Sequence, residues 1–198
     1  MKSALRHVSV HFFAIIIGAC STTANRENVG GSADSGRIPV RQLTGRVVDT
    51  ANLLLPSDQE RLSKLSQAYE QETGHQIAVL IIPTLGGEAI ESFCLRTANT
   101  WRLGRKGIDD GILVCLAPNE RKVRIELGIG MSRYISDADA SEIITTEMTP
   151  FFRVREFAEG LERGLRRLME EARKFVAANT IWSLEGGFAF SITEGTWV

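Results

Sequence analysis

The sequence predicts a single α/β domain in which a small mixed β-sheet is sandwiched by about four α-helices. Two continuous apolar runs, at 77–82 and 112–116, are typical of strands that are buried on both faces. Segments with helical apolar spacing separate and follow these runs, which indicates layers of helix on sheet. The chain has 198 residues, of which 43% are hydrophobic and 24% are charged, and this suits one such domain with appendages.

The first half of the domain alternates strands and helices. Residues 47–48 form a short strand signal that ends at Asp49, and a loop follows. The segment Ser57-Asp58-Gln59-Glu60 has the spacing of a capping box, so we expect a helix from there to Gly74. A second helix is expected over about 88–101, after the first buried strand. The strands joined through helices should be parallel, with right-handed crossovers.

A hairpin and two more helices complete the predicted domain. The turn at 118–121 is short, so the strands at 112–116 and 123–127 should pair antiparallel, the second with one solvated face. A third helix is expected to begin near Ser136 and to end at Pro150. The last helix has an apolar stripe formed by Phe157, Leu161, Leu165, Leu168 and Phe175.

Residues 1–19 are predicted to be a lipoprotein signal peptide. Lys2 and Arg6 precede an apolar run at 8–17, which is shorter than the roughly 20 residues that a membrane-spanning helix needs. The segment Ile17-Gly18-Ala19-Cys20 then resembles the lipobox of bacterial lipoproteins, in which the cysteine is lipidated. We therefore expect lipidation at Cys20, and an ordinary signal cut near the same point is the alternative.

The rest of the chain divides into three segments. Residues 20–42 are rich in glycine and polar residues and predict a flexible tether, with an arm packed on the domain as the alternative. The α/β domain is expected over 43–178. In the tail, 179–198, the apolar residues Phe188, Phe190 and Ile192 alternate like a strand, so the tail is expected either to add an edge strand or to lack structure.

The order of short motifs in this domain resembles the TPM domain family. The resemblance covers about 43–173 and implies a compact α/β sandwich in an exported or membrane-tethered protein. For some members of the family, divalent-ion binding and acid phosphatase activity have been proposed. The matching blocks are Thr44-Gly45-Arg46-Val47-Val48-Asp49, Gly74-His75-Gln76-Ile77-Ala78-Val79, Trp101-Arg102-Leu103-Gly104, Asp109-Asp110-Gly111-Ile112-Leu113, Arg121-Lys122-Val123-Arg124-Ile125-Glu126-Leu127-Gly128-Ile129-Gly130, Ser136-Asp137-Ala138 and Pro150-Phe151-Phe152.

The loops carry one concentrated set of carboxylates, which is the candidate metal site. Asp109 and Asp110 precede one strand of the predicted hairpin and should lie near the residues that follow the other, and Asp49 joins them if its strand ends at the same edge. Carboxylates without histidine or cysteine suit Ca²⁺ or Mg²⁺. The alternative is a local role for each, as a turn former or a helix cap. The full set is Asp49, Asp109, Asp110, Asp137 and Asp139.

Two functions remain open from the sequence. The favoured one is a non-catalytic module for binding, assembly or protein turnover in the cell envelope, which also binds a divalent cation. The alternative is a metal-dependent acid phosphatase, with Asp109 as nucleophile or metal ligand and with Arg102 and Arg105 holding phosphate. His75, the one histidine left after signal cleavage, is expected to be structural.

The expected location and partners follow from the signal and the charge. A lipid at Cys20 would attach the chain to a membrane facing the periplasm, with the outer membrane favoured. The expected partner is an unidentified envelope protein. Cleavage removes two cations and no acid, so the formal net charge changes from −1 to −3, which is unlike a nucleic-acid binder. Cys94 and Cys115 fall on inward positions, either as free thiols, which we favour, or as a disulfide.

Overall fold

A four-stranded mixed sheet forms the centre of the domain. This computed structural model describes residues 37–185, with side chains as far as residue 174. The strand order is β1-β2-β3-β4, in which the first three strands are parallel and the last is antiparallel to its neighbour, as predicted for the hairpin. The strands are β1 (Val47–Asp49), β2 (Ile77–Ile81), β3 (Ile112–Ala117) and β4 (Lys122–Leu127).

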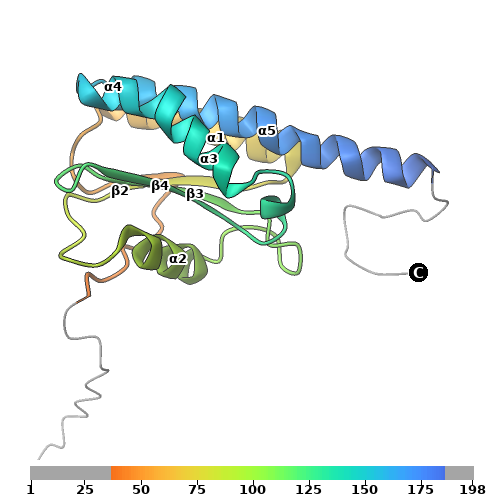
Figure 1. Cartoon of the computed structure of the whole chain (residues 1–198), viewed down its shortest axis with the longest axis horizontal. Coiled ribbons are helices and arrows are strands. Elements are labelled where there is room, and N and C mark those ends of the chain that lie inside the picture. The colour runs from red at the N-terminus through yellow and green to blue at the C-terminus, as the bar shows by residue number, and fades with distance from the viewer. Residues whose placement is uncertain (1–36, 186–198) are drawn as a thin grey trace, which may run out of the picture. The chain divides into compact units, whose positions relative to one another are not determined.

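Helices cover both faces of this sheet, which confirms the predicted fold class. In Figure 1, one helix lies below the sheet and the others lie above it. The lower helix is α2 (Ile90–Trp101). The upper layer contains α1 (Pro56–Thr73), α3 (Asp137–Ile143), α4 (Thr149–Arg153) and α5 (Phe157–Glu185).

The two central strands are buried on both faces. Alternate residues of β2 point to opposite layers: Val79 packs in the cluster under α1 and α5, and Leu80 packs in the cluster over α2. Both side chains have no exposed surface. Full burial of one such side chain contributes about 1.5–3 kcal/mol, so the apolar run of β2 is a main determinant of the sandwich.

The two parallel crossovers have opposite hands. Helix α1 connects β1 to β2 on one face, and α2 connects β2 to β3 on the other, while both steps move across the sheet in the same direction. The expected right-handed crossover therefore holds for one connection and is wrong for the other. The physical reason is the apolar character of both faces, because two helices on one face would leave residues such as Leu80 uncovered.

Helix α1 begins at Pro56, so the predicted capping box is wrong. The residue before it, Leu55, has an extended backbone and makes no side-chain cap, and Ser57 already lies within the first turn. Proline favours this position because its fixed φ suits a helix and its missing N–H would have no partner there. The predicted end of the helix is confirmed, since Gly74 has a φ of 76° and donates its N–H to the carbonyl of Glu70.

The helical segment after β4 continues past Pro150, where we expected it to end. Helix α3 begins after Ser136 as predicted, with a capping box formed by Ser136 and Asp139. A wide π turn at Ile144–Met148 then follows α3. A new helix, α4, then begins at Thr149, so that the proline lies in a first turn, where its missing N–H costs nothing.

The last residues of the segment that we predicted to be a flexible tether pack on α2. The indole Nε1 of Trp101 donates to the carbonyl of Arg41 at 2.7 Å, and the Nη2 of Arg96 donates to the carbonyl of Ile38 at 2.8 Å. Packing on the domain thus includes Ile38, which lies five residues before the predicted boundary at residue 43. The predicted signal and Cys20 lie outside the described residues.

The C-terminal part of the chain is helical for longer than expected. Helix α5 runs to Glu185 and so includes the first seven residues of the predicted tail. The alternating residues Phe188, Phe190 and Ile192 lie outside the described part. Within residues 37–185, none of the helices combines the length and the apolar character that a membrane span requires.

Candidate functional site

The predicted acidic residues lie at opposite ends of the sheet. Asp49 is at the carboxyl end of β1, where it pairs with Ile81 at the carboxyl end of β2. Asp110 instead precedes β3, close to the pairing of Ile112 with Ile77 at the amino end of β2. Because the three strands are parallel, the expected meeting of Asp49 with Asp109 and Asp110 is wrong.

Asp49 organises its own loop. Its Oδ1 accepts the N–H of Ala51 at 2.9 Å, and its Oδ2 accepts the N–H groups of Leu53 and Leu54 at 2.8 and 2.9 Å. These three bonds turn the chain from β1 toward Pro56. This is the local role that remained as the alternative to a metal ligand.

The two aspartates near α3 lie at the start of that helix. Oδ2 of Asp139 accepts the backbone N–H of Ser136 at 2.8 Å, and this bonding to Ser136 lowers the pKa of the Asp139 carboxyl. Asp137 is the exposed first residue of the helix. Across the residues that the structure describes, no three His, Cys, Asp or Glu side chains are grouped so that they could share a metal ion.

Asp110 is fully buried and is held by Arg105. The backbone N–H of Arg105 donates to Oδ1 at 2.8 Å, and its Nε donates to Oδ2 at 2.7 Å. The guanidinium charge that we considered for phosphate is therefore engaged with a carboxylate. A partner of this kind offsets the cost of burying the Asp110 charge and fixes the loop between α2 and β3.

A histidine and a tyrosine extend this buried cluster. Nε2 of His75 lies 3.7 Å from Oδ2 of Asp110, and the hydroxyl oxygen of Tyr69 lies 3.3 Å from Nδ1 of the same histidine. Burial lowers the pKa of His75 despite the opposing charge of Asp110, and burial raises the pKa of Tyr69 to about 12. Both groups are therefore neutral at pH 7, and the side chain of His75 is only 1% exposed. The cluster has the geometry of a structural support, as expected for His75.

The loop after β4 is pressed against this supported loop. The N–H of Gly130 donates to the carbonyl of Asp109 at 3.0 Å. A Cβ at Gly128 would lie 2.0 Å from that carbonyl oxygen, and a Cβ at Gly130 would lie 2.0 Å from the carbonyl oxygen of Ile108. Only glycine permits this approach, and the contact confirms that Asp109 lies near Gly128.

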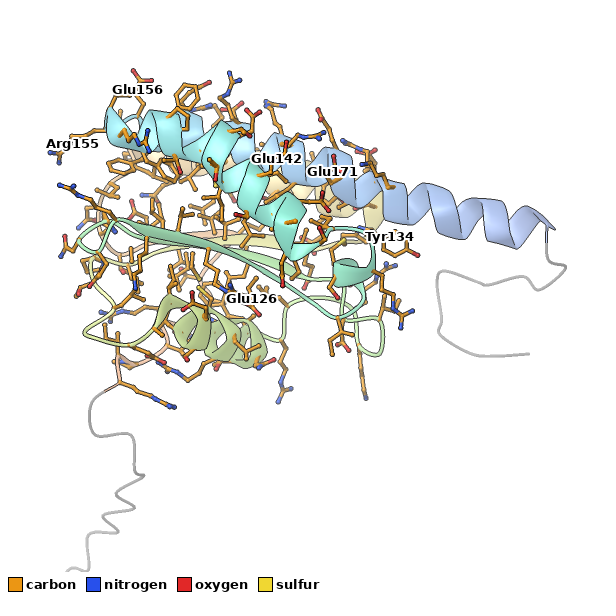
Figure 2. The ribbon with its side chains drawn as sticks, viewed as in Figure 1. Glu126, Tyr134, Glu142, Arg155, Glu156 and Glu171 are labelled. Carbon is orange, nitrogen blue, oxygen red and sulfur yellow. The ribbon has the colours of Figure 1, made fainter. Side chains whose placement is uncertain are left out.

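The close contact places two apolar side chains in solvent at one end of the sheet. Ile129 is 73% exposed and Ile108 is 38% exposed. We call residues 102–109 and 128–133 the loop surface. Figure 2 shows Tyr134, which directly follows it, on the side of the domain opposite to Arg155 and Glu156. Exposed cations of the loop surface are Arg102, Lys106 and Arg133.

The sequence analysis did not identify the two isoleucines as surface residues. In a sequence, Ile108 and Ile129 read as ordinary apolar positions beside predicted strands. The available signal is the pair of glycines that flank Ile129, since a residue between two glycines in a tight turn has little chain to cover it.

Comparison with solved structures reveals domains of the same fold. The N-terminal domain of a protein from P. gingivalis is 31% identical, with a TM-score of 0.61, over 72% of this chain and 85% of that one. The BA42 protein from Bizionia argentinensis is 14% identical, with a TM-score of 0.56, over 64% and 86% of the two chains. The N-terminal domain of the cg2496 protein from Corynebacterium glutamicum is 15% identical, with a TM-score of 0.50, over 80% and 94%.

Comparison with protein families gives the same result from the sequence. None of the curated proteins matches the chain. Residues 47–171, which are more than half of the chain and extend from β1 into α5, match the TPM domain. The chain therefore belongs to the TPM domain family.

Proposed function

We propose that this chain is a lipid-anchored, periplasm-facing TPM domain protein that binds an envelope protein at its loop surface without catalysing a reaction. The observation that carries the proposal is the exposure of Ile129 and Ile108 on two loops that touch at Gly128 and Gly130. Exposed apolar side chains on a flexible loop can fold back onto the protein. Here the glycine contacts hold them in place, so the apolar surface is available to a partner.

The chemistry of the loop surface indicates the kind of partner. Complete burial of an exposed isoleucine side chain contributes about 1.5–3 kcal/mol, which makes Ile129, the more exposed of the two, the expected anchor. Lys106 and Arg133 are exposed on the same loops, and Asp109 is the one exposed acid there. The proposed partner therefore has an apolar pocket with acidic residues at its rim, because opposite charges favour encounter and register.

The engagement of Asp49 and Asp110 counts against a phosphoryl-transfer mechanism that uses either carboxylate, and it leaves Asp109 as the candidate nucleophile. Asp49 holds three backbone N–H groups, and Asp110 is paired with Arg105. A phosphatase would need a metal or free cations around the transferred group, together with a nucleophile or an activated water. Turnover of a phosphate ester by the purified chain that is lost in Asp109→Asn would favour the alternative function.

Site-specific photo-crosslinking tests the proposal in the full-length chain. A photoreactive residue at position 129 should give a discrete adduct with an envelope protein, and the same residue at Val154 should not. Val154 is a matched control because it is 64% exposed and lies next to Arg155, on the other side of the domain in Figure 2. Equal adducts from both positions, or none from 129, would contradict the proposed surface.

The anchor is tested separately by labelling with a fatty acid. The proposal expects incorporation that is lost in Cys20→Ala, since the motif at Ile17-Gly18-Ala19-Cys20 directs the lipid to this sulfur. Unchanged labelling and membrane fractionation in the variant would contradict the proposed lipid anchor. This result would not bear on the proposed binding at the loop surface.

A further inference from the structure

Two free thiols lie together in the core between the sheet and α2. Cys94 is on the inner side of α2 and has no exposed surface, and Cys115 is on β3 and is 2% exposed. Both belong to the same apolar cluster, which also contains Phe93 and Leu80. The shared cluster places the inner face of α2 against the face of β3 that carries Cys115. Burial, followed by the neighbouring Cys94 thiol, raises the pKa of Cys115.

We propose that Cys94 and Cys115 form an intramolecular disulfide when the chain folds in an oxidising compartment. Two S–H bonds break and one S–S bond forms. The oxidant is a small disulfide such as oxidised glutathione, whose S–S bond breaks by way of a mixed disulfide; it takes up the two electrons and the two protons and leaves as two thiols. The structure with two free thiols is then the reduced form.

The burial of both thiols in the folded domain determines at which stage of folding the disulfide can form. The attacking group is a thiolate, and a raised thiol pKa inside an apolar cluster makes that species rare in the folded domain. Oxidation is therefore slow once α2 has packed on β3, and fast while the chain is still folding. An intact native domain should keep its thiols reduced for much longer than a refolding chain does.

The disulfide would enclose part of the loop surface within the segment of chain that it closes. The bond would close the segment 94–115, which contains residues 102–109, and the buried pair of Arg105 with Asp110 lies inside the same segment. Closing a loop of this size restricts the unfolded chain and raises stability. The bond would also join the two elements between which that part of the loop surface is held.

Refolding of the full chain tests the inference. Cys20→Ala leaves Cys94 and Cys115 as the only cysteines. After refolding with oxidised glutathione, the monomer should be lighter by two hydrogen atoms and should leave no thiol for a maleimide in denaturant. Its melting temperature should exceed that of the same protein refolded with reductant by several degrees.

Two results would overturn the inference. One is a monomer with both thiols reactive in denaturant after oxidative refolding, and the other is a product joined between chains. The single variants Cys94→Ala and Cys115→Ala, each in the same background, should melt at one temperature with and without reductant. If either variant fails to fold, the number of reactive thiols in the refolded Cys20→Ala protein still tests the inference. None of these results depends on the crosslinking at position 129.

Discussion

Arg105 and Asp110 form a two-point contact within one loop, in which backbone N–H and guanidinium Nε each donate to a different oxygen of a fully buried carboxylate. The distances are 2.8 and 2.7 Å. This pair fixes the loop that carries Ile108, so the apolar part of the loop surface depends on a buried ion pair beneath it.

Removal of the carboxylate should destabilise the domain strongly. Asp110→Ala leaves the N–H and the guanidinium of Arg105 without their acceptor, and we expect a loss of about 3 kcal/mol in the free energy of unfolding. Urea unfolding measures this loss. The neighbouring Asp109→Asn is the control, since Asp109 is exposed with a φ of 54°, which asparagine tolerates, and it should change stability by less than about 0.5 kcal/mol. Similar losses in both variants would contradict the role of the pair.

His75 should make stability depend on pH in a defined window. Burial lowers the pKa of His75 in the folded state, so the unfolded chain binds the proton first as pH falls. The free energy of unfolding should therefore decrease from about pH 7.5 to about pH 5.5, by at most about 1.4 kcal/mol for this one group. That window lies above the ordinary range of the carboxylates. Urea unfolding of His75→Gln should show a flatter profile, and profiles of equal slope would refute the assignment.

The glycine contact between the two loops should not accept a side chain. Gly128→Ala would place a Cβ 2.0 Å from the carbonyl oxygen of Asp109, so the loops must separate, at a cost of about 2 kcal/mol. Gly45→Ala is the matched control, because nothing lies within 4 Å of the point that its Cβ would occupy and its φ is not positive. Thermal melts compare the two, and an equal effect of both substitutions would mean that the contact is not tight.

Asp49 should act through hydrogen bonds and not through a metal ion. Asp49→Ala removes the acceptor of three backbone N–H groups and should cost about 2–3 kcal/mol, with the same loss in calcium, in magnesium and in chelator. Asp49→Asn keeps one comparable oxygen and should lose less. If the parent were stabilised by calcium and the variant were not, the predicted metal site would be restored for this residue.

The strands could be predicted from the sequence more reliably than their arrangement in the sheet. The apolar run of β2 and the short turn before β4 predicted a buried strand and an antiparallel hairpin, because both signals are local. The predicted parallel direction of β1, β2 and β3 already places Asp49, at the end of β1, and Asp110, before β3, at opposite ends of the sheet, so the expected meeting was inconsistent with the predicted strand directions. The strand order depends on how distant segments pack, which spacing along the chain does not encode.

The candidate site was the least predictable part for the same reason. The predicted start of a helix near Ser136 is confirmed, since the signals that start a helix are local. In contrast, Ile129 has the side chain of a core residue, and only the contact of Gly128 and Gly130 with a loop from another part of the chain places it in solvent. An exposed apolar residue is therefore found in the structure and not in the composition.

The most direct test of the proposed function is the affinity of the crosslinked envelope protein, once purified, for three forms of the chain. Calorimetry should give a dissociation constant at least about tenfold weaker for Ile129→Asp than for the parent, because a charge replaces the buried anchor. Val154→Asp, a change of the same chemistry on the other side of the domain, should bind like the parent. Equal affinity of all three forms, or an equal loss in both variants, would contradict binding through the loop surface.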